Sequence, residues 1–250
     1  MRIICIGDST MQYNSCITYP QTGWIQMLDR FFTSGTKIIN LARNGRSSKS
    51  FIDEARFSHA LTVAKEGDFA LIQFGHNDEK SADLARFTSP ERDGEFRKNL
   101  EFFVTEFQKK GVLPLLLTPI ARRKFIAENK IESTHAPYAE AIKQTAQKMN
   151  VPCVDLTSAT ETYFACLGEK YTRRFYMNFE GGLYKNFPEG KADDSHLRPD
   201  GAFEVCRLFE KELLSLKEKW PSYEQFFKNL ICISGDNPDG IDIDDEKSMW

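Results

Sequence analysis

Five short runs of apolar and β-branched residues alternate with longer segments whose apolar residues recur every three or four positions. Runs of the first kind predict buried strands, and the second pattern predicts amphipathic helices. The predicted strands are Ile3–Ile6, Lys37–Leu41, Phe69–Phe74, Leu113–Thr118 and Pro152–Leu156. The predicted helices are Trp24–Phe32, Ser48–Ala64, Gly94–Lys110, Pro137–Asn150 and Pro199–Trp220.

The alternation of strands and helices determines the expected fold class. Strands joined through a helix run parallel, because a parallel connection needs a crossover of a dozen residues or more. Strands that are apolar along their whole length indicate a sheet covered on both faces. We therefore expect an α/β protein, a three-layer α/β/α sandwich with a five-stranded parallel sheet. Its site should lie beyond the carboxyl ends of the strands, where the strand order switches.

Two segments fall outside this pattern. Residues 159–190 are rich in aromatic residues and glycine and are predicted to form a long irregular loop, which in a compact domain is usually functional. Residues 234–250 are acidic with few apolar side chains, which predicts a solvated tail. We expect one catalytic domain over residues 1–233, followed by this acidic C-terminal tail at 234–250.

Composition and charge exclude several partners. The chain has 250 residues, with 33 Lys and Arg against 36 Asp and Glu. It therefore has no excess of positive charge with which to bind a nucleic acid. No apolar stretch approaches the roughly 18 residues of a membrane helix, and the opening apolar run is too short for a signal peptide. Six widely spaced cysteines without a CxxC pair indicate free thiols in a reducing compartment. The expectation is a cytoplasmic protein without a membrane partner.

A serine and a histidine far apart in the sequence are candidates for nucleophilic catalysis. Ser9 lies in Gly7-Asp8-Ser9-Thr10, directly after the first predicted strand, and a hydroxyl is a weak nucleophile unless a base takes its proton. His196 lies in Asp193-Asp194-Ser195-His196, ahead of the last helix. Asp193 could orient the imidazole, with Asp194 as the alternative partner. Either segment alone is equally well explained as a turn or helix cap.

Two further segments offer hydrogen-bond donors. Asn44-Gly45-Arg46-Ser47 and Gly75-His76-Asn77-Asp78 follow the second and third predicted strands. The Asn77 amide and the backbone N–H groups of Gly45 and Ser9 could stabilise a developing oxyanion. Asn and Gly are also ordinary turn residues, so neither segment is specific by itself. Because three segments follow successive strands and the fourth precedes the last helix, all four should converge at one edge of the sheet.

These segments, in this order, resemble the conserved blocks of the SGNH (GDSL-type) hydrolases. More narrowly, the chain resembles the rhamnogalacturonan acetylesterases and related carbohydrate esterases of family 12. The resemblance spans roughly residues 1–214 and includes three further stretches, Asn44–Phe51, Leu117–Arg123 and Thr134–Tyr138. It implies the flavodoxin-like sandwich of that family. Ser195 stands where threonine is commoner, which is a mild departure.

The resemblance also implies roles for individual residues. Ser9 would be the nucleophile, His196 the base and Asp193 the group that orients it. The oxyanion hole would be formed by the backbone of Ser9 and Gly45 and by the side chain of Asn77. By their own chemistry, Arg46, His76 and His135, together with Arg122 and Arg123, could bind sugar hydroxyls or a uronate carboxylate. Asp8 is a further candidate substrate contact.

The expected activity is that of a serine esterase that removes acetyl groups from rhamnogalacturonan- or pectin-type oligosaccharides through an acetyl-enzyme. No cofactor is implied, and no cluster of His, Cys and Asp has metal-ligand spacing. Two alternatives remain open. One is a lipase-like or thioester hydrolase of the wider family, and the other is a non-catalytic carbohydrate-binding protein on the same scaffold.

Overall fold

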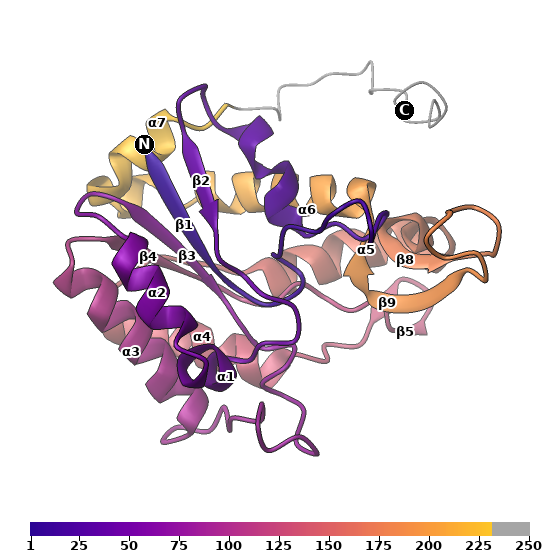
Figure 1. The fold of residues 1–250 in the computed structure, drawn as a ribbon, viewed down its shortest axis with the longest axis horizontal. Helices are drawn as coiled ribbons and strands as arrows, with labels where there is room; N and C mark the ends of the chain where they lie inside the picture. Colours follow the sequence, from indigo (N-terminus) through magenta and orange to yellow (C-terminus); the bar gives the residue numbers. More distant parts are fainter. Residues whose placement is uncertain (232–250) are drawn as a thin grey trace.

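The main sheet lies at the centre of the molecule (Figure 1) in a computed structural model that describes residues 1–231. Within these residues it has five parallel strands in the order β2-β1-β3-β4-β7. The strands are β1 (Arg2–Gly7), β2 (Lys37–Asn40), β3 (Phe69–Gln73), β4 (Leu113–Leu117) and β7 (Cys153–Val154). All five predicted strands are confirmed, and their order is that of flavodoxin-like sheets.

Alternate side chains of each strand enter two separate apolar clusters. In β1, Ile3 and Cys5 pack into the cluster on one face, whereas Ile4 and Ile6 pack into the cluster on the other. None of these four side chains is accessible to solvent. Because both faces are buried, the strand reads as one continuous apolar run instead of an alternating one.

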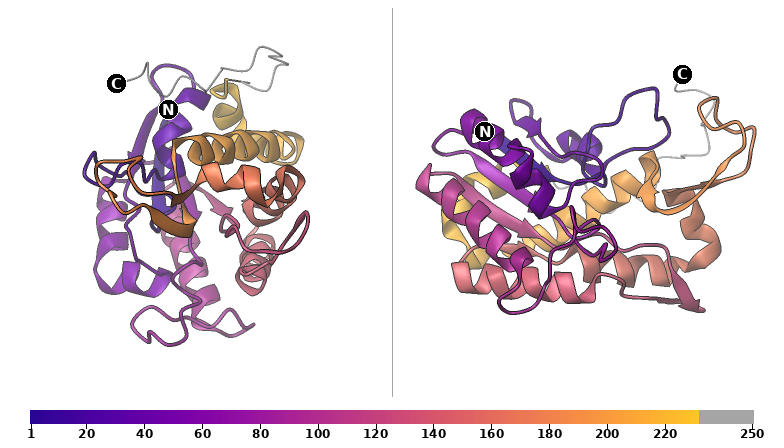
Figure 2. Two further views of the ribbon diagram at one scale, coloured as in Figure 1. Left: turned by 90° about the vertical axis from the view of Figure 1, so that its right-hand side faces the viewer. Right: turned by 60° about the horizontal axis from the view of Figure 1, so that its bottom comes forward.

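Helices cover both faces of the sheet, as Figure 1 and the two views of Figure 2 show. On one face lie α1 (Ser48–Asp53), α2 (Arg56–Val63), α3 (Glu95–Lys109) and α4 (Ala136–Met149). On the other face lie the 3₁₀ helix η1 (Trp24–Phe31), α5 (Leu156–Thr172), α6 (Pro199–Leu214) and α7 (Glu224–Lys228). The expected three-layer α/β/α sandwich is therefore confirmed.

Three of the expected helices differ in detail. The segment 48–64 forms two helices, because Ala55 adopts a left-handed conformation with φ of +55° between α1 and α2. The segment 24–32 is helical but winds as a 3₁₀ helix. The last long helix, α6, ends at Leu214, and short 3₁₀ turns follow at η3 (Lys217–Lys219) and η4 (Pro221–Tyr223).

The expectation of an irregular loop over residues 159–190 is wrong for much of its length. Helix α5 begins at Leu156, capped by the Asp155 carboxylate, which accepts a hydrogen bond from the backbone N–H of Ser158 at 3.1 Å. It runs to Thr172 with a kink at Gly168, where φ is +81°. Starting the segment at residue 159 hides this N-cap signal. After α5, η2 (Arg173–Phe175) leads into β8 (Tyr176–Phe179).

The segment 193–196 lies ahead of α6, as expected, within a two-stranded ribbon outside the main sheet. Strand β9 (Lys191–Leu197) pairs antiparallel with β8. Between the pairs Tyr176–Leu197 and Asn178–Ala192, β8 has one residue whereas β9 has four, Asp193 to His196. A bulge of this kind redirects side chains away from the regular ladder.

The remaining regular structure is a small hairpin of β5 (Phe125–Ala127) and β6 (Lys130–Ile131). Within residues 1–231, no helix has both the length and the apolar character needed to cross a bilayer. The acidic tail expected at 234–250 lies outside the described residues.

The aromatic cluster between α3 and the sheet provides a test of the core. The ring of Phe103 is fully buried, with centroids 4.6 Å from Phe57 and 5.4 Å from Phe74. We expect Phe103→Ala to lower the free energy of unfolding by about 3–5 kcal/mol, because it leaves a cavity that the core cannot fill. Phe102→Ala, at a neighbouring ring that is 43% exposed, should cost clearly less. Urea denaturation measures both, and equal losses would contradict this account of the packing.

Candidate active site

The carboxyl ends of the three central strands lie level with one another. Gly7 at the end of β1 pairs with Gln73 at the end of β3, and Gln73 pairs with Leu117 at the end of β4. The polar segments after these strands therefore start from the same edge of the sheet. As expected from the sequence, this edge gathers the candidate residues.

Ser9 is presented by a tight turn at the end of β1. The Asp8 carboxylate accepts hydrogen bonds from the backbone N–H of Thr10 at 2.9 Å and from its hydroxyl at 2.8 Å. Gly7 is the last residue of β1, and a Cβ there would lie 2.6 Å from the carbonyl oxygen of Gln73. Glycine is needed because the backbones approach closely.

Ser9, His196 and Asp193 form a continuous chain of hydrogen bonds. The Ser9 hydroxyl lies 2.9 Å from His196 Nε2, and His196 Nδ1 lies 2.8 Å from an Asp193 carboxylate oxygen. The other oxygen of Asp193 accepts the backbone N–H groups of Ser195 and His196 at 2.9 and 3.0 Å. Burial alone would raise the pKa of Asp193, but the bonds from His196 and these N–H groups outweigh it and hold that pKa below its usual range.

Asp194, the alternative partner, is used elsewhere. Its carboxylate accepts hydrogen bonds from Arg123 at 2.9 Å and from the Asn178 amide at 2.8 Å. Its carbonyl oxygen accepts the backbone N–H of Arg123 at 2.8 Å. The guanidinium of Arg123 is largely buried and also donates to the carbonyl of Glu169. Asp194 therefore anchors the bulged strand, which leaves Asp193 as the carboxylate beside His196.

Gly45 and Asn77 come from adjacent loops that are bonded together. Gly45 has φ of +76°, a conformation that favours glycine. The Asn77 side chain donates to the carbonyl oxygen of Arg46 at 3.1 Å. Both residues line the same pocket as Ser9 and His196. The donors expected at an oxyanion therefore lie in the same pocket as the serine hydroxyl.

Buried Asp78 joins the two loops beneath the pocket. Its carboxylate accepts the backbone N–H of Ser48 at 2.9 Å, the Ser48 hydroxyl at 2.6 Å and the Thr88 hydroxyl at 2.8 Å. Its second oxygen accepts the backbone N–H of Gly75 at 3.1 Å. Burial raises the pKa of Asp78 to about 7, although the bonds from Ser48 and Thr88 act in the opposite direction.

The pocket has a volume of about 390 Å³ and a polar lining. Besides the hydrogen-bonded chain and the oxyanion donors, four cationic side chains line it. They are Arg46, Lys80, Arg86 and Arg122. A pocket with this lining favours a substrate that is polar or negatively charged around the scissile bond.

Arg122 is held in place from two sides. Its guanidinium donates to the Glu79 carboxylate at 2.5 Å and to the Ser195 hydroxyl at 2.6 Å. Glu79 in turn lies 2.8 Å from His135 Nδ1. Burial would raise the pKa of Glu79, but the bond from His135 and the charge of Arg122 keep it lowered. Arg122 is thus fixed at the pocket wall instead of being free in solvent.

Four of the candidate substrate contacts separate into two pairs. Arg46 and His76 line the pocket. Burial, and after it the electrostatic effect of the neighbouring His135 and Arg122, lowers the pKa of His76 well below its ordinary value, so its imidazole is neutral. Asp8 and His135 are fully buried and do not line the pocket. They bind Thr10 and Glu79 instead.

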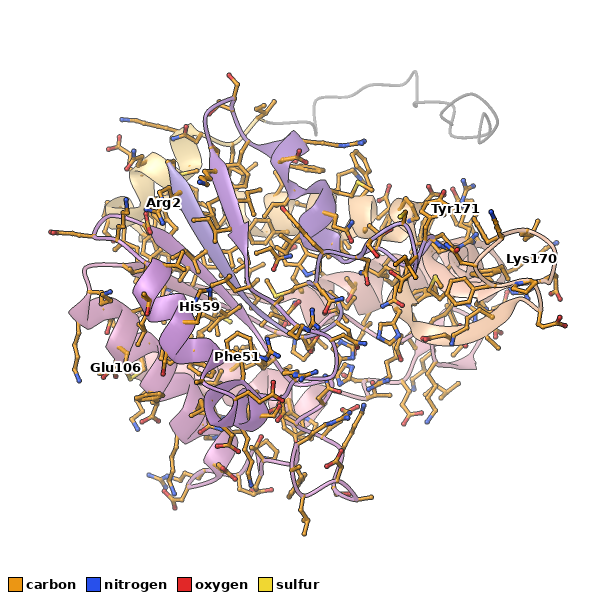
Figure 3. All side chains as sticks on the ribbon, viewed as in Figure 1. Arg2, Phe51, His59, Glu106, Lys170 and Tyr171 are labelled. Atoms are coloured by element: carbon orange, nitrogen blue, oxygen red, sulfur yellow. The ribbon has the colours of Figure 1, made fainter. Side chains whose placement is uncertain are left out.

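A larger hollow of about 880 Å³ lies elsewhere, between the β5–β6 hairpin and the end of α5. It shares no lining residue with the pocket around Ser9. Figure 3 labels two of its residues, Lys170 and Tyr171, at the end of the molecule opposite the N-terminus. Within the described part of the chain, its lining contains no Ser, Thr, Cys or His, so we place the candidate site in the smaller pocket, which holds Ser9 bonded to His196. Among residues 1–231, no group of three or more His, Cys, Asp or Glu is arranged to hold a metal ion.

Sequence reasoning missed Lys80 and Arg86 in this pocket. Lys80 carried a usable signal, because it follows Asn77 by three residues and so lies in the same turn. Arg86 lies in a loop with no recognisable motif, so the sequence alone gave no reason to single it out.

Comparisons with known proteins agree with this geometry. Residues 5–201 match the model of the GDSL-like lipase/acylhydrolase family, and the chain belongs to that family. It is 32% identical over 208 residues to the rhamnogalacturonan acetylesterase RhgT of Bacillus subtilis, covering 83% of this chain and 87% of that protein. It is 34% identical over 215 residues to a probable rhamnogalacturonan acetylesterase, YesY, of the same organism, covering 86% and 93%.

Solved structures show the same fold. The protein YxiM of Bacillus subtilis superposes with a TM-score of 0.70 at 24% identity, covering 87% of this chain, which spans 56% of that longer chain. The acetylxylan esterase Axe2 of Geobacillus stearothermophilus superposes with a TM-score of 0.59 at 16% identity, covering 85% of this chain and 93% of that one. The family membership and the similarity to RhgT show that the protein is an esterase, and its fold is α/β.

The raised pKa of Asp78 predicts how stability depends on pH. The folded protein binds the Asp78 proton more tightly than the unfolded chain, whose ordinary pKa is 3.8. Its contribution to the free energy of unfolding is therefore fully present below pH 4 and is lost as the pH rises to about 7. The change is on the order of 1.4 kcal/mol per unit of pKa difference. Urea denaturation of the wild type and Asp78→Asn between pH 4 and 8 measures it, and a wild-type advantage that grows with pH would contradict the prediction.

Proposed function

We propose that the protein is a serine esterase that removes acetyl groups from acetylated carbohydrates through an acetyl-enzyme. The observation that carries this proposal is the chain of hydrogen bonds from Ser9 through His196 to Asp193. A hydroxyl, an imidazole and a carboxylate in this geometry are what acyl transfer to serine requires. The acetylesterase names of RhgT and YesY support the acetyl group as the one transferred.

The reaction has two steps. Ser9 Oγ attacks the ester carbonyl carbon while His196 Nε2 accepts the hydroxyl proton, and Asp193 stabilises the imidazolium that forms. Collapse of the tetrahedral intermediate breaks the bond to the sugar oxygen, which takes the proton from His196 and leaves as an alcohol. Water then attacks the acetyl-enzyme with His196 again as the base, which releases acetate and restores Ser9.

The oxyanion of each tetrahedral intermediate would be bound by the backbone N–H groups of Ser9 and Gly45 and by the Asn77 amide. Donors that are already in position act on the transition state without reorganising. Asn77 is restrained by its bond to Arg46, and Gly45 is held in a conformation that other residues adopt only with strain. Substrate contacts from Arg46 and His76 belong to the same pocket.

The lining of the pocket favours a short acyl group over a lipid chain. Among the described residues that line it there is no valine, leucine, isoleucine or methionine, and no phenylalanine, tyrosine or tryptophan. A lipase-like or long-chain thioester hydrolase needs an apolar trench for its acyl chain, because burial of each CH₂ contributes about 0.8 kcal/mol. The acetyl group needs no such trench.

The four cations of the pocket support a uronate-containing sugar of the rhamnogalacturonan or pectin type. Arginine guanidinium groups pair with carboxylates through two parallel hydrogen bonds. Arg122, which Glu79 and Ser195 hold beside His76, adds a fixed guanidinium to the pocket wall. The names of RhgT and YesY point to the same class of substrate.

The role of Ser9 is tested by Ser9→Ala with 4-nitrophenyl acetate. We expect kcat to fall by at least about 10⁴-fold, because the nucleophile is removed, while the thermal midpoint stays unchanged. Ser58→Ala, which alters an exposed hydroxyl on α2, is the matched control and should retain full activity. Full activity in Ser9→Ala would refute the proposed mechanism, and sugar binding without turnover by the wild type would favour a non-catalytic role.

The substrate class is tested by acetate release from acetylated pectin fragments before and after chemical reduction of their carboxylates. We expect kcat/KM to fall by about tenfold or more on reduction, because the contacts to the pocket cations are lost. In parallel, 4-nitrophenyl acetate should be hydrolysed faster than the octanoyl ester. Equal rates on native and reduced fragments would refute uronate recognition, and a preference for octanoyl would favour a lipase.

A further inference from the structure

Lys80 makes a direct contact with the side chain proposed for the oxyanion hole. It lies in the turn after β3 and lines the pocket, and its ammonium donates to Asn77 Oδ1 at 2.9 Å. Its backbone N–H also donates to the carbonyl oxygen of Asn77, at 3.3 Å. In the function proposed above, this lysine is one of the four pocket cations and has no role in the chemical steps.

Lys80 differs from the other three cations of the pocket. Each arginine is within 3.1 Å of a carboxylate, in the pairs Arg46–Glu54, Arg86–Asp83 and Arg122–Glu79. Among residues 1–231, no carboxylate lies within ion-pair distance of the Lys80 ammonium. Its hydrogen bond goes to a neutral amide instead. The residue is exposed to solvent, yet its ammonium lies among arginines, a position that is electrostatically unfavourable.

The surroundings of Lys80 act against its charged form. Burial lowers the pKa of Lys80, and the charges of Arg86 and Arg122 lower it further, while Asp8 and Asp83 act in the opposite direction. The hydrogen bond to Asn77 offsets part of this effect and holds the ammonium over the amide.

Two hydrogen bonds define the orientation of the Asn77 amide. Oδ1 accepts from Lys80, and Nδ2 donates to the carbonyl oxygen of Arg46 at 3.1 Å. If the amide were turned by a half rotation, its NH₂ would face the ammonium and its oxygen would face the Arg46 carbonyl, and both contacts would be repulsive. The observed orientation is therefore strongly preferred. Nδ2 has two hydrogens, and the Arg46 carbonyl takes one of them.

We propose that Lys80 is a positioning residue that orients and polarises Asn77, so that the second N–H of Nδ2 becomes a stronger donor to the oxyanion. A positive charge on Oδ1 draws electron density from the amide, which strengthens its N–H donors. The gain is largest when negative charge develops on the substrate, so it appears in the transition state more than in substrate binding. This inference rests on the proposed function, because it requires an oxyanion intermediate.

The test is a double-mutant cycle on 4-nitrophenyl acetate with Lys80→Met, Asn77→Ala and the double variant. We expect Lys80→Met to lower kcat by about three- to thirtyfold with KM changed by less than about twofold. In the Asn77→Ala background, the same substitution should change kcat by less than about twofold, because its target is gone. Lys80→Arg keeps a cationic donor and should recover most of the loss.

Lys65→Met is the matched control, since it removes an exposed ammonium before β3, at the end of the strand opposite to the site. It should leave kcat unchanged. Thermal midpoints of all variants are measured, and a variant counts only if its midpoint matches that of the wild type. Because Lys80 is an exposed residue, Lys80→Met should fold normally.

Two results would overturn the inference. The first is an unchanged kcat in Lys80→Met. The second is a loss of the same size with and without Asn77, which would mean that Lys80 acts on the reaction by another route, such as direct binding of an anionic substrate. Both are distinguishable from failure of the proposed function, because that failure appears as full activity in Ser9→Ala.

Discussion

The level ends of β1, β3 and β4 are the constraint on which the rest of the site depends. The register that pairs Gly7 with Gln73 and Gln73 with Leu117 brings three loops to one edge. A slip of one residue would exchange the two faces of a strand, so the apolar side chains on both sides hold this register in place. The buried Gln73 amide strengthens it, since it donates to the Thr118 carbonyl at 2.8 Å and accepts from the Trp24 indole at 2.9 Å.

The histidine of the site reaches this edge by a different route. His196 lies on the β8–β9 ribbon, outside the main sheet, in the bulge that opposes four residues to one. Asp193 closes the bulge by accepting two backbone N–H groups, and Asp194 fastens it to Arg123. The two adjacent acidic residues thus make different contacts. Asp193 is hydrogen-bonded to the imidazole, and Asp194 attaches the strand to Arg123.

Much of the fold was predictable because burial on both sheet faces leaves a clear apolar pattern, as in β1 and β3. The convergence of Ser9, Asn77 and His196 followed from strand ends and from the family resemblance. The family resemblance assigned the orienting role to Asp193, but from the residues alone the choice between Asp193 and Asp194 was not predictable, because it depends on a bulge set by long-range pairing with β8. Nor was the burial of Asp8 and His135, whose polar groups bind Thr10 and Glu79, since sequence spacing does not distinguish an inward from an outward side chain.

The bond between Ser9 and His196 joins positions separated by 187 residues of chain. No local connection holds these two residues together. Although the ribbon forms a separate sheet, Tyr176 of β8 and Leu197 of β9 are buried in the same apolar core as η1, α5 and α6. The spacing of the serine and the histidine is therefore a property of the packed domain as a whole, since a core at this density does not let one element shift alone.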